Sequence, residues 1–257
     1  MTDLELVVLW ERMKEDGVLP RPFVFTSSTL LHRDYEREKM QTEDRLRDEV
    51  VPTLGGILEV VARPDIRVVV YGWDPRNPKD PESYIRLLAV RRADRAFLLT
   101  QKPGETIWHS GGFTIVEHHV LALSDAVVSA LHQPCAGSRG EVVLTTMGDR
   151  TAELDDTYYR PVHRAADDTP QQRSAEFRSS AADSVGVIEI SQGASVFGPR
   201  GITRHVLRWR DIVGDGRYAI TPGPPPVAIP AGNRRMTELL NSRLADVVRT
   251  IKDEPTR

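Results

Sequence analysis

The stretch that decides the fold is Asp65–Gln101, which reads DIRVVVYGWDPRNPKDPESYIRLLAVRRADRAFLLTQ. Its runs Ile66–Tyr71 and Ile85–Arg91 are rich in β-branched and other apolar residues, and this composition predicts two strands. A tight turn at Ala93–Arg95 leads into a third predicted strand, Ala96–Thr100. Neighbouring strands with hairpin-like connections favour antiparallel pairing, because a parallel crossover needs room for a helix.

A similar stretch occurs nearer the C-terminus. The run Val185–Ile190 resembles the first strand, and Thr203–Arg210 and Arg217–Thr221 correspond to the second and third strands. Each copy continues through a loop into an amphipathic helix. Two interpretations are open: a duplicated unit, or two antiparallel meanders that look alike by chance. The segment Pro134–Gly140 separates the copies, so we expect an N-terminal half (1–134) and a C-terminal half (135–257).

The bulk properties of the chain are those of an ordinary soluble globular protein. The chain has 257 residues, enough for one large domain or two small ones, with 40% hydrophobic and 28% charged residues. A net charge of −3 gives no electrostatic reason to expect nucleic acid or an anionic membrane as a partner. The single cysteine excludes an internal disulfide, and no signal peptide or membrane span is recognisable. We therefore expect a cytoplasmic protein without membrane insertion.

The remaining chain predicts mostly helices. Apolar periodicity and stop residues place helices at 4–14, 29–51, 53–63 and 119–131, with a last helix that Asn233 is expected to cap. Short strands are expected at Phe23–Thr26 and Glu141–Thr146, a turn at Gly111–Gly112, and a short helix at Asp149–Tyr159. The polar segment Pro161–Ala182 is expected to be weakly ordered, either as a mobile loop or as a loose helix.

No catalytic motif is recognisable. The adjacent His118 and His119 cannot share a metal ion in the manner of an i, i+4 pair, and Cys135 has no identifiable activating partner. The sequence contains no nucleophile elbow and no phosphate-binding loop. We therefore expect no enzyme activity, no metal ion and no other cofactor, although missing motifs do not by themselves exclude catalytic residues that are dispersed in the sequence.

The connection Gly72–Ser83 has the features of a contact surface. It carries the large aromatic residue Trp73 and is stiffened by three prolines. A rigid loop with one aromatic suits a protein contact, because little conformational entropy is lost on binding. The alternative is an ordinary long hairpin loop, with Trp73 folded back onto the core.

Several landmarks occur in the order found in one known family. The opening Leu4–Arg12 (LELVVLWER), the helix end Val60–Pro64 (VVARP) before a strand, and Gly216–Tyr218 before a final amphipathic helix resemble the EspG family. These are proteins associated with ESX (type VII) secretion in mycobacteria and related actinobacteria. The resemblance covers essentially the whole chain. It implies an α+β fold, in which a central antiparallel β-sheet is flanked by helical bundles and two halves are related by a pseudo-twofold axis.

The resemblance also implies a function. Family members are cytosolic chaperones that bind the tip of the PPE subunit in a PE–PPE heterodimer, shield its apolar residues and deliver the pair for export. The loop between the second and third strands of the family and the C-terminal helical part form the contact. The matching loop here is Gly72–Ser83, so Trp73, Asp74 and Arg76 are the partner-binding candidates, together with the helix Asn233–Lys252.

A second hypothesis is an α/β enzyme or ligand-sensing protein with a pocket between the two halves. Convergent polar and titratable side chains in a pocket would favour that hypothesis, whereas a protruding loop beside an apolar groove would favour the chaperone. The amino-acid sequence indicates neither the oligomeric state of the protein nor the particular PE–PPE pair that it would bind.

Overall fold

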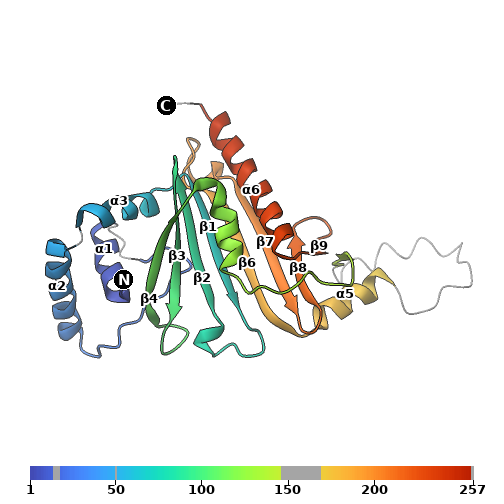
Figure 1. Ribbon diagram of the computed structural model, residues 1–257, viewed down its shortest axis with the longest axis horizontal. Helices are drawn as coiled ribbons and strands as arrows, with labels where there is room; N and C mark the ends of the chain where they lie inside the picture. The colour runs from blue at the N-terminus through green and yellow to red at the C-terminus, as the bar shows by residue number, and fades with distance from the viewer. Residues whose placement is uncertain (14–17, 50, 146–168, 256–257) are drawn as a thin grey trace, which may run out of the picture.

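The protein has an α+β fold built on one nine-stranded antiparallel sheet (Figure 1). The computed structural model describes residues 1–13, 18–49, 51–145 and 169–255. Their strands are β1 (Ile66–Trp73), β2 (Ile85–Arg92), β3 (Arg95–Pro103), β4 (Ser110–His118), β5 (Val142–Val143), β6 (Ala182–Gln192), β7 (Arg204–Ile212), β8 (Gly216–Thr221) and β9 (Val227–Pro230).

Six α-helices lie within the same described ranges. They are α1 (Asp3–Met13), α2 (His32–Glu49), α3 (Val51–Ala62), α4 (Leu123–Ser129), α5 (Pro170–Ser179) and α6 (Asn233–Asp253). Short 3-10 helices occur at η1 (Pro81–Ser83), η2 (Val120–Ala122) and η4 (Pro199–Gly201). In this part of the chain, no helix combines the length and the apolar character needed to cross a membrane.

The two predicted meanders meet in the middle of the sheet. The strand order is β4-β3-β2-β1-β6-β7-β8-β9-β5, and each named pair of neighbours is antiparallel. The central pair joins β1 to β6, with Val69 opposite Glu189 and Tyr71 opposite Val187. The stretches that look alike in sequence are therefore direct neighbours.

One face of the sheet is covered by α4 and α6, which lie side by side in Figure 1. The predicted stripe of α6 is confirmed, because Met236, Leu240 and Val247 are fully buried against this face. Their partners in the sheet include Val68, Val70, Leu87, Ile188, Ile190, Leu207 and Trp209. Burial of this continuous apolar surface is what holds both meanders to one pair of helices.

In the described part of the chain, helices cover the opposite face only at its two ends. Helices α1 and α3 pack on the β2–β4 end, where they bury Leu88, Phe97 and Leu99. Helix α5 packs on the β5–β9 end, where Phe177 contacts the ring of Tyr218 edge-on at 5.1 Å. No helix of the described chain covers the middle of this face. We call this surface the open strip; it comprises Arg67, Tyr71, Trp73, Val187, Glu189, Ser191, Arg204, Val206 and Arg208.

Two local predictions in the N-terminal half are wrong. The segment Phe23–Thr26 is not a strand, because the side-chain amide of Gln101 takes the place of a neighbouring strand. This amide accepts a bond from the Val24 N–H and donates one to the Val24 carbonyl, both at 3.0 Å. Gly111–Gly112 is not a turn but part of β4. A Cβ atom at Gly112 would lie 2.9 Å from the carbonyl oxygen of Met1, so glycine allows the N-terminus to approach this strand.

The C-terminal half also differs from the prediction in three places. Residues 170–179 form the ordered helix α5, which begins with a capping box between Thr169 and Gln172. Helix α6 has Gly232 at its N-cap, and Asn233 is its first residue. The predicted strand 141–146 is confirmed only as the two-residue β5. The predicted short helix 149–159 and residues 161–168 lie outside the described residues.

Candidate functional site: a loop and an open sheet face

Trp73 is the last residue of β1 rather than the tip of a loop. It lies opposite Val185 of β6, and its ring centroid is 5.3 Å from that of Tyr71. Because residues two apart in a strand point to the same face, both rings lie on the open strip. Trp73 is partly exposed, so the structure places it on the sheet surface and not in the core.

Tyr71 and Trp73 belong to a larger group of aromatic and arginine side chains. The guanidinium of Arg86 lies 4.7 Å from the centroid of the Tyr84 ring and 5.8 Å from that of Tyr71. Arg86 is 5% exposed, and its Nη2 donates to the Ile107 carbonyl at 2.8 Å. Burial lowers the pKa of Arg86, and burial followed by the neighbouring Tyr84 raises the pKa of Tyr71. This group was not predicted from the sequence, although the two-residue spacing of Tyr71 and Trp73 indicates that both side chains lie on the same face of a strand.

The loop after Trp73 is held by side-chain hydrogen bonds as well as by prolines. The carboxylate of Asp74 accepts bonds from Arg76 Nε at 3.0 Å, Arg76 Nη2 at 2.8 Å and the Arg76 N–H at 2.8 Å. The hydrogen bond from the Arg76 side chain is the main reason that the pKa of Asp74 is lowered. Arg76 Nη1 also lies 2.7 Å from Asp183 of β6, which ties the loop to the other meander.

The far end of the same loop is anchored in a similar way. The side chain of Asp80 caps η1 by accepting from the Glu82 N–H at 3.0 Å, and the Tyr84 hydroxyl donates to the Pro78 carbonyl at 2.9 Å. Residues 75–79 between these anchors are exposed. The structure therefore brings Trp73, Asp74 and Arg76 together at one end of the open strip. The resemblance placed the contact loop between the second and third strands. Because Phe23–Thr26 is not a strand, this loop instead joins β1 to β2, the first two strands of the described chain.

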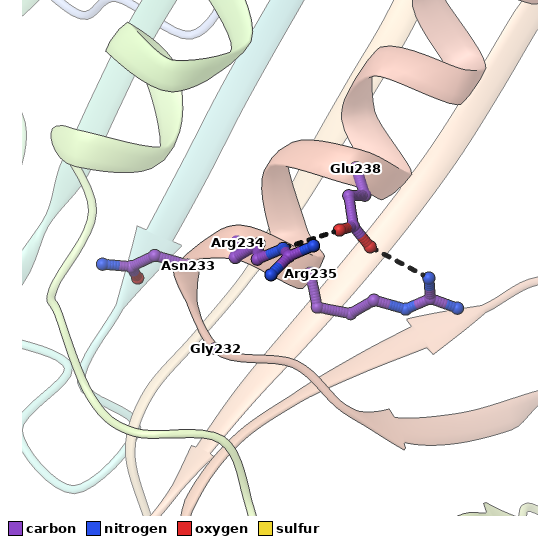
Figure 2. A pocket seen from close by; sticks show the side chains of 5 residues that line it. All are labelled: Gly232, Asn233, Arg234, Arg235 and Glu238. Carbon is purple, nitrogen blue, oxygen red and sulfur yellow. Dashed lines mark hydrogen bonds and ion pairs between the residues drawn. The ribbon is translucent and has the colours of Figure 1, made fainter.

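The start of α6 forms an open hollow of about 370 Å³ (Figure 2). Arg234 and Arg235 both reach Glu238, with closest distances of 3.1 and 3.2 Å, and these bonds lower the pKa of Glu238. The Asn233 side chain points away from them and donates to the side chain of Gln133. Two arginines and one carboxylate leave this hollow with a surplus of one positive charge, and the three side chains are paired with one another rather than arranged as an acid–base pair.

The other end of α6 borders a more apolar groove of about 430 Å³. Val120 and Leu121 face Leu244 and Val248 across it, and Leu121 is 76% exposed. Basic residues rim the groove: Arg91, Arg249 and Lys252. An apolar floor with a charged rim is typical of surfaces that bind proteins reversibly.

The potential metal-ligating side chains of the described residues are dispersed. No group of three or more histidine, cysteine, aspartate or glutamate side chains is arranged there to hold a metal ion. His118 is the last residue of β4, and the ring of His119 caps η2 by accepting from the Leu121 N–H at 3.3 Å. Cys135 is exposed. An open sheet face, a pinned loop and an apolar groove together form a surface suited to binding a partner protein.

The comparisons with known proteins agree with this interpretation. The model of the EspG family matches residues 2–242, so the chain belongs to the EspG family, the non-enzymatic chaperones of type VII (ESX) secretion. A similar solved structure is the Mycobacterium tuberculosis type VII secretion system chaperone EspG5 in complex with a PE25–PPE41 dimer. It shares 15% sequence identity with this chain over 86% of each chain, with a TM-score of 0.48. No protein with a curated description matches the sequence.

Proposed function

We propose that this EspG-family chaperone binds the tip of the PPE subunit in a PE–PPE heterodimer, keeps the pair soluble and delivers it for export. Membership of the family supports the client class. The observation that carries the proposal is the open strip, a sheet surface with partly exposed aromatic residues that no described helix covers. We further propose that the protein acts in the cytoplasm, where its clients await export.

The mechanism of such a chaperone is physical. A client tip with exposed apolar residues aggregates unless these residues are covered. A sheet surface binds with little loss of conformational entropy, because its side chains are already held by their neighbours. Arg67, Arg204 and Arg208 surround the apolar side chains of the strip, and such a polar surround keeps an interface reversible. The chaperone can therefore release its client at the secretion machine.

Within this surface we propose Trp73, Asp74 and Arg76 as client-binding residues. Trp73 supplies apolar area beside Tyr71, and aromatic side chains of this kind often dominate interface energetics. Asp74 holds Arg76 in a fixed position, so the exposed guanidinium is ordered before the client arrives. The apolar groove between η2 and α6 is proposed as the helical part of the interface.

We also propose that the chain is a single EspG-like domain of two halves, 1–134 and 135–257, related by a pseudo-twofold axis. The order of elements supports this proposal. After α1 and α2, one half runs α3-β1-η1-β2-β3-β4-η2-α4; after β5, the other runs α5-β6-η4-β7-β8-β9-α6. The axis would pass between the central antiparallel strands β1 and β6.

The test is co-expression of the chain with each PE–PPE pair of its own host, followed by size-exclusion chromatography. A ternary complex is the expected result with a cognate pair. Trp73→Ala and Arg76→Ala should each reduce the amount of complex. Two matched controls should leave it unchanged: Trp108→Ala removes another exposed tryptophan, and Arg37→Ala removes the arginine of another local pair, with Asp34.

Failure of all host pairs to bind the folded protein would overturn the proposed function. A complex that is indifferent to Trp73→Ala and Arg76→Ala would keep the function and overturn the proposed residues. In that case Leu121→Ser, at the apolar groove, becomes the variant expected to weaken the complex.

A further inference from the structure

Three neighbouring strands place Arg67, Ser191 and Arg204 in one row on the open strip. Arg67 of β1 is paired with Ser191 of β6, and Ser191 is paired with Arg204 of β7. Directly opposite residues in antiparallel strands point to the same face, so the serine hydroxyl lies between two guanidinium groups. This row lies away from Trp73, at the other end of β1.

The row lines a polar cavity of about 260 Å³. The other residues around the cavity are Arg21, Val69, Glu189, Gln192, Gly193 and Ile202. Three arginines and one carboxylate give the lining a surplus of two positive charges. Ser191 is 8% exposed and borders the cavity.

One nitrogen of the partly exposed Arg67 lacks the acceptor that a buried donor needs. Its Nε is buried without a hydrogen bond among the described residues. Glu189 is the nearby carboxylate, but its Oε1 is paired with Arg204 Nε at 3.4 Å. Burial lowers the pKa of Arg67 more than the charge of Glu189 raises it through space. Buried polar atoms are almost always satisfied, so the unpaired Nε of Arg67, a residue that lines the cavity, indicates a missing acceptor.

We propose that this cavity is a binding site for a carboxylate. A guanidinium presents parallel N–H donors that match the two oxygens of a carboxylate, and the Ser191 hydroxyl adds a third donor beside them. Glu189 disfavours the doubly charged phosphate, because repulsion grows with the charge of the ligand. The site goes beyond the proposed function, since it can bind a free carboxylate without any PE–PPE pair.

The test is a titration of the full ¹⁵N-labelled chain, followed by NMR at the Nε–Hε signal of Arg67. Loss of one signal in Arg67→Lys assigns it. Sodium acetate should shift this signal saturably, whereas sodium chloride at equal ionic strength should not. The peptide acetyl-Gly-Glu-Gly-amide is the second probe. Saturation by both probes indicates that an acidic side chain of a polypeptide fits, and saturation by acetate alone indicates a site for small free carboxylates; both results support the proposal.

Variants localise the binding. Arg67→Gln and Arg21→Gln should each weaken acetate binding about tenfold or more, as expected for the loss of a charge-assisted hydrogen bond. Arg21 is an exposed residue without a recorded ion pair, so its replacement tests the site even if Arg67→Gln perturbs the sheet. Arg208→Gln is the matched control, because Arg208 lies on the same face of β7 but outside the cavity.

Three results would overturn the proposal. The first is a shift that rises linearly with acetate or is equal with chloride. The second is an equal loss of binding in Arg208→Gln and Arg67→Gln. The third is tighter binding of inorganic phosphate than of acetate, which would contradict the assignment to carboxylates.

Discussion

The indole ring of Trp209 lies across the backbone of Gly186, in the space that a side chain at this glycine would occupy. The same row continues to Gly72 of β1, where a Cβ atom would lie 2.6 Å from the indole Cζ2. Trp209 is 1% exposed, and its Nε1 donates to the Ser184 hydroxyl at 3.3 Å. Two glycines in the central strands thus make room for one large aromatic side chain beneath α4 and α6.

Replacement of Gly186 by alanine should therefore destabilise the protein. The added methyl group overlaps the indole ring, and overpacking of a well-packed core costs about 1–3 kcal/mol. Urea denaturation measures this loss. The matched control is Gly55→Ala in α3, where nothing lies within 4 Å of the added Cβ. This change should stabilise the helix by about 0.5–1 kcal/mol, so equal effects of both variants would contradict the explanation.

The buried ion pair between Asp211 and Arg217 should be essential for stability. Arg217 is fully buried, and its Nε and Nη2 donate to the Asp211 carboxylate at 2.7 and 2.8 Å. Asp211→Asn leaves a buried cation without its counter-charge, and such a change costs about 3–5 kcal/mol. Chemical denaturation measures the loss of free energy of unfolding.

Two further variants test that explanation. Glu43→Gln removes the half-exposed pair with Arg12, and this change should cost no more than about 1 kcal/mol. The double variant Asp211→Leu, Arg217→Met removes both buried charges and should recover part of the stability lost in Asp211→Asn. A small effect of Asp211→Asn, equal to that of Glu43→Gln, would show that the buried pair is dispensable.

Asp215 should make stability depend on pH in the acid range. Burial raises its pKa, but bonds from the Ser138 N–H, the Tyr218 hydroxyl and the Ser138 hydroxyl outweigh burial and lower it below the ordinary 3.8. A lowered pKa in the folded state stabilises the protein above the pKa of the unfolded chain, and this stabilisation is lost as the pH falls through the folded pKa. At pH 7 the contribution is therefore complete.

The comparison of the wild-type protein with Asp215→Asn at two pH values measures this contribution. The difference in free energy of unfolding should be largest near neutrality and should shrink as the pH is lowered to about 3. A difference between wild type and Asp215→Asn that stays constant with pH would exclude the carboxylate as its source.

The N-terminus of α5 should depend on the side chain of Thr169. This hydroxyl accepts from the Gln172 N–H, and the Gln172 side chain accepts from the Thr169 N–H at 3.0 Å. Thr169→Ala should cost about 1 kcal/mol and increase hydrogen exchange in the first turn of α5. Ser242→Ala, at an exposed position in the middle of α6, is the control that should leave exchange unchanged. Unchanged exchange in Thr169→Ala would mean that tertiary packing alone holds the helix start.

Segments with a strong local pattern were predicted well. The strands around Val69 and Val187 and the helix that carries Met236 and Leu240 are confirmed, because their apolar periodicity is a local property of the chain. The segments whose structure was predicted wrongly depend on residues that are distant in the sequence. Val24 is satisfied by the side chain of Gln101, 77 positions away, and no local pattern carries that information.

The candidate site shows the same division. The sequence alone identified the stiff Gly72–Ser83 connection and the resemblance to the EspG family, because prolines and landmark residues act locally or in order along the chain. Only the tertiary structure decided that Trp73 joins Tyr71 on an uncovered sheet face, and that Arg67, Ser191 and Arg204 share one row. The physical reason is strand register, which is set by hydrogen bonds between β1, β6 and β7 and determines which side chains meet. Strands β1 and β6 lie more than 100 positions apart in the sequence, so no local pattern specifies how they pair.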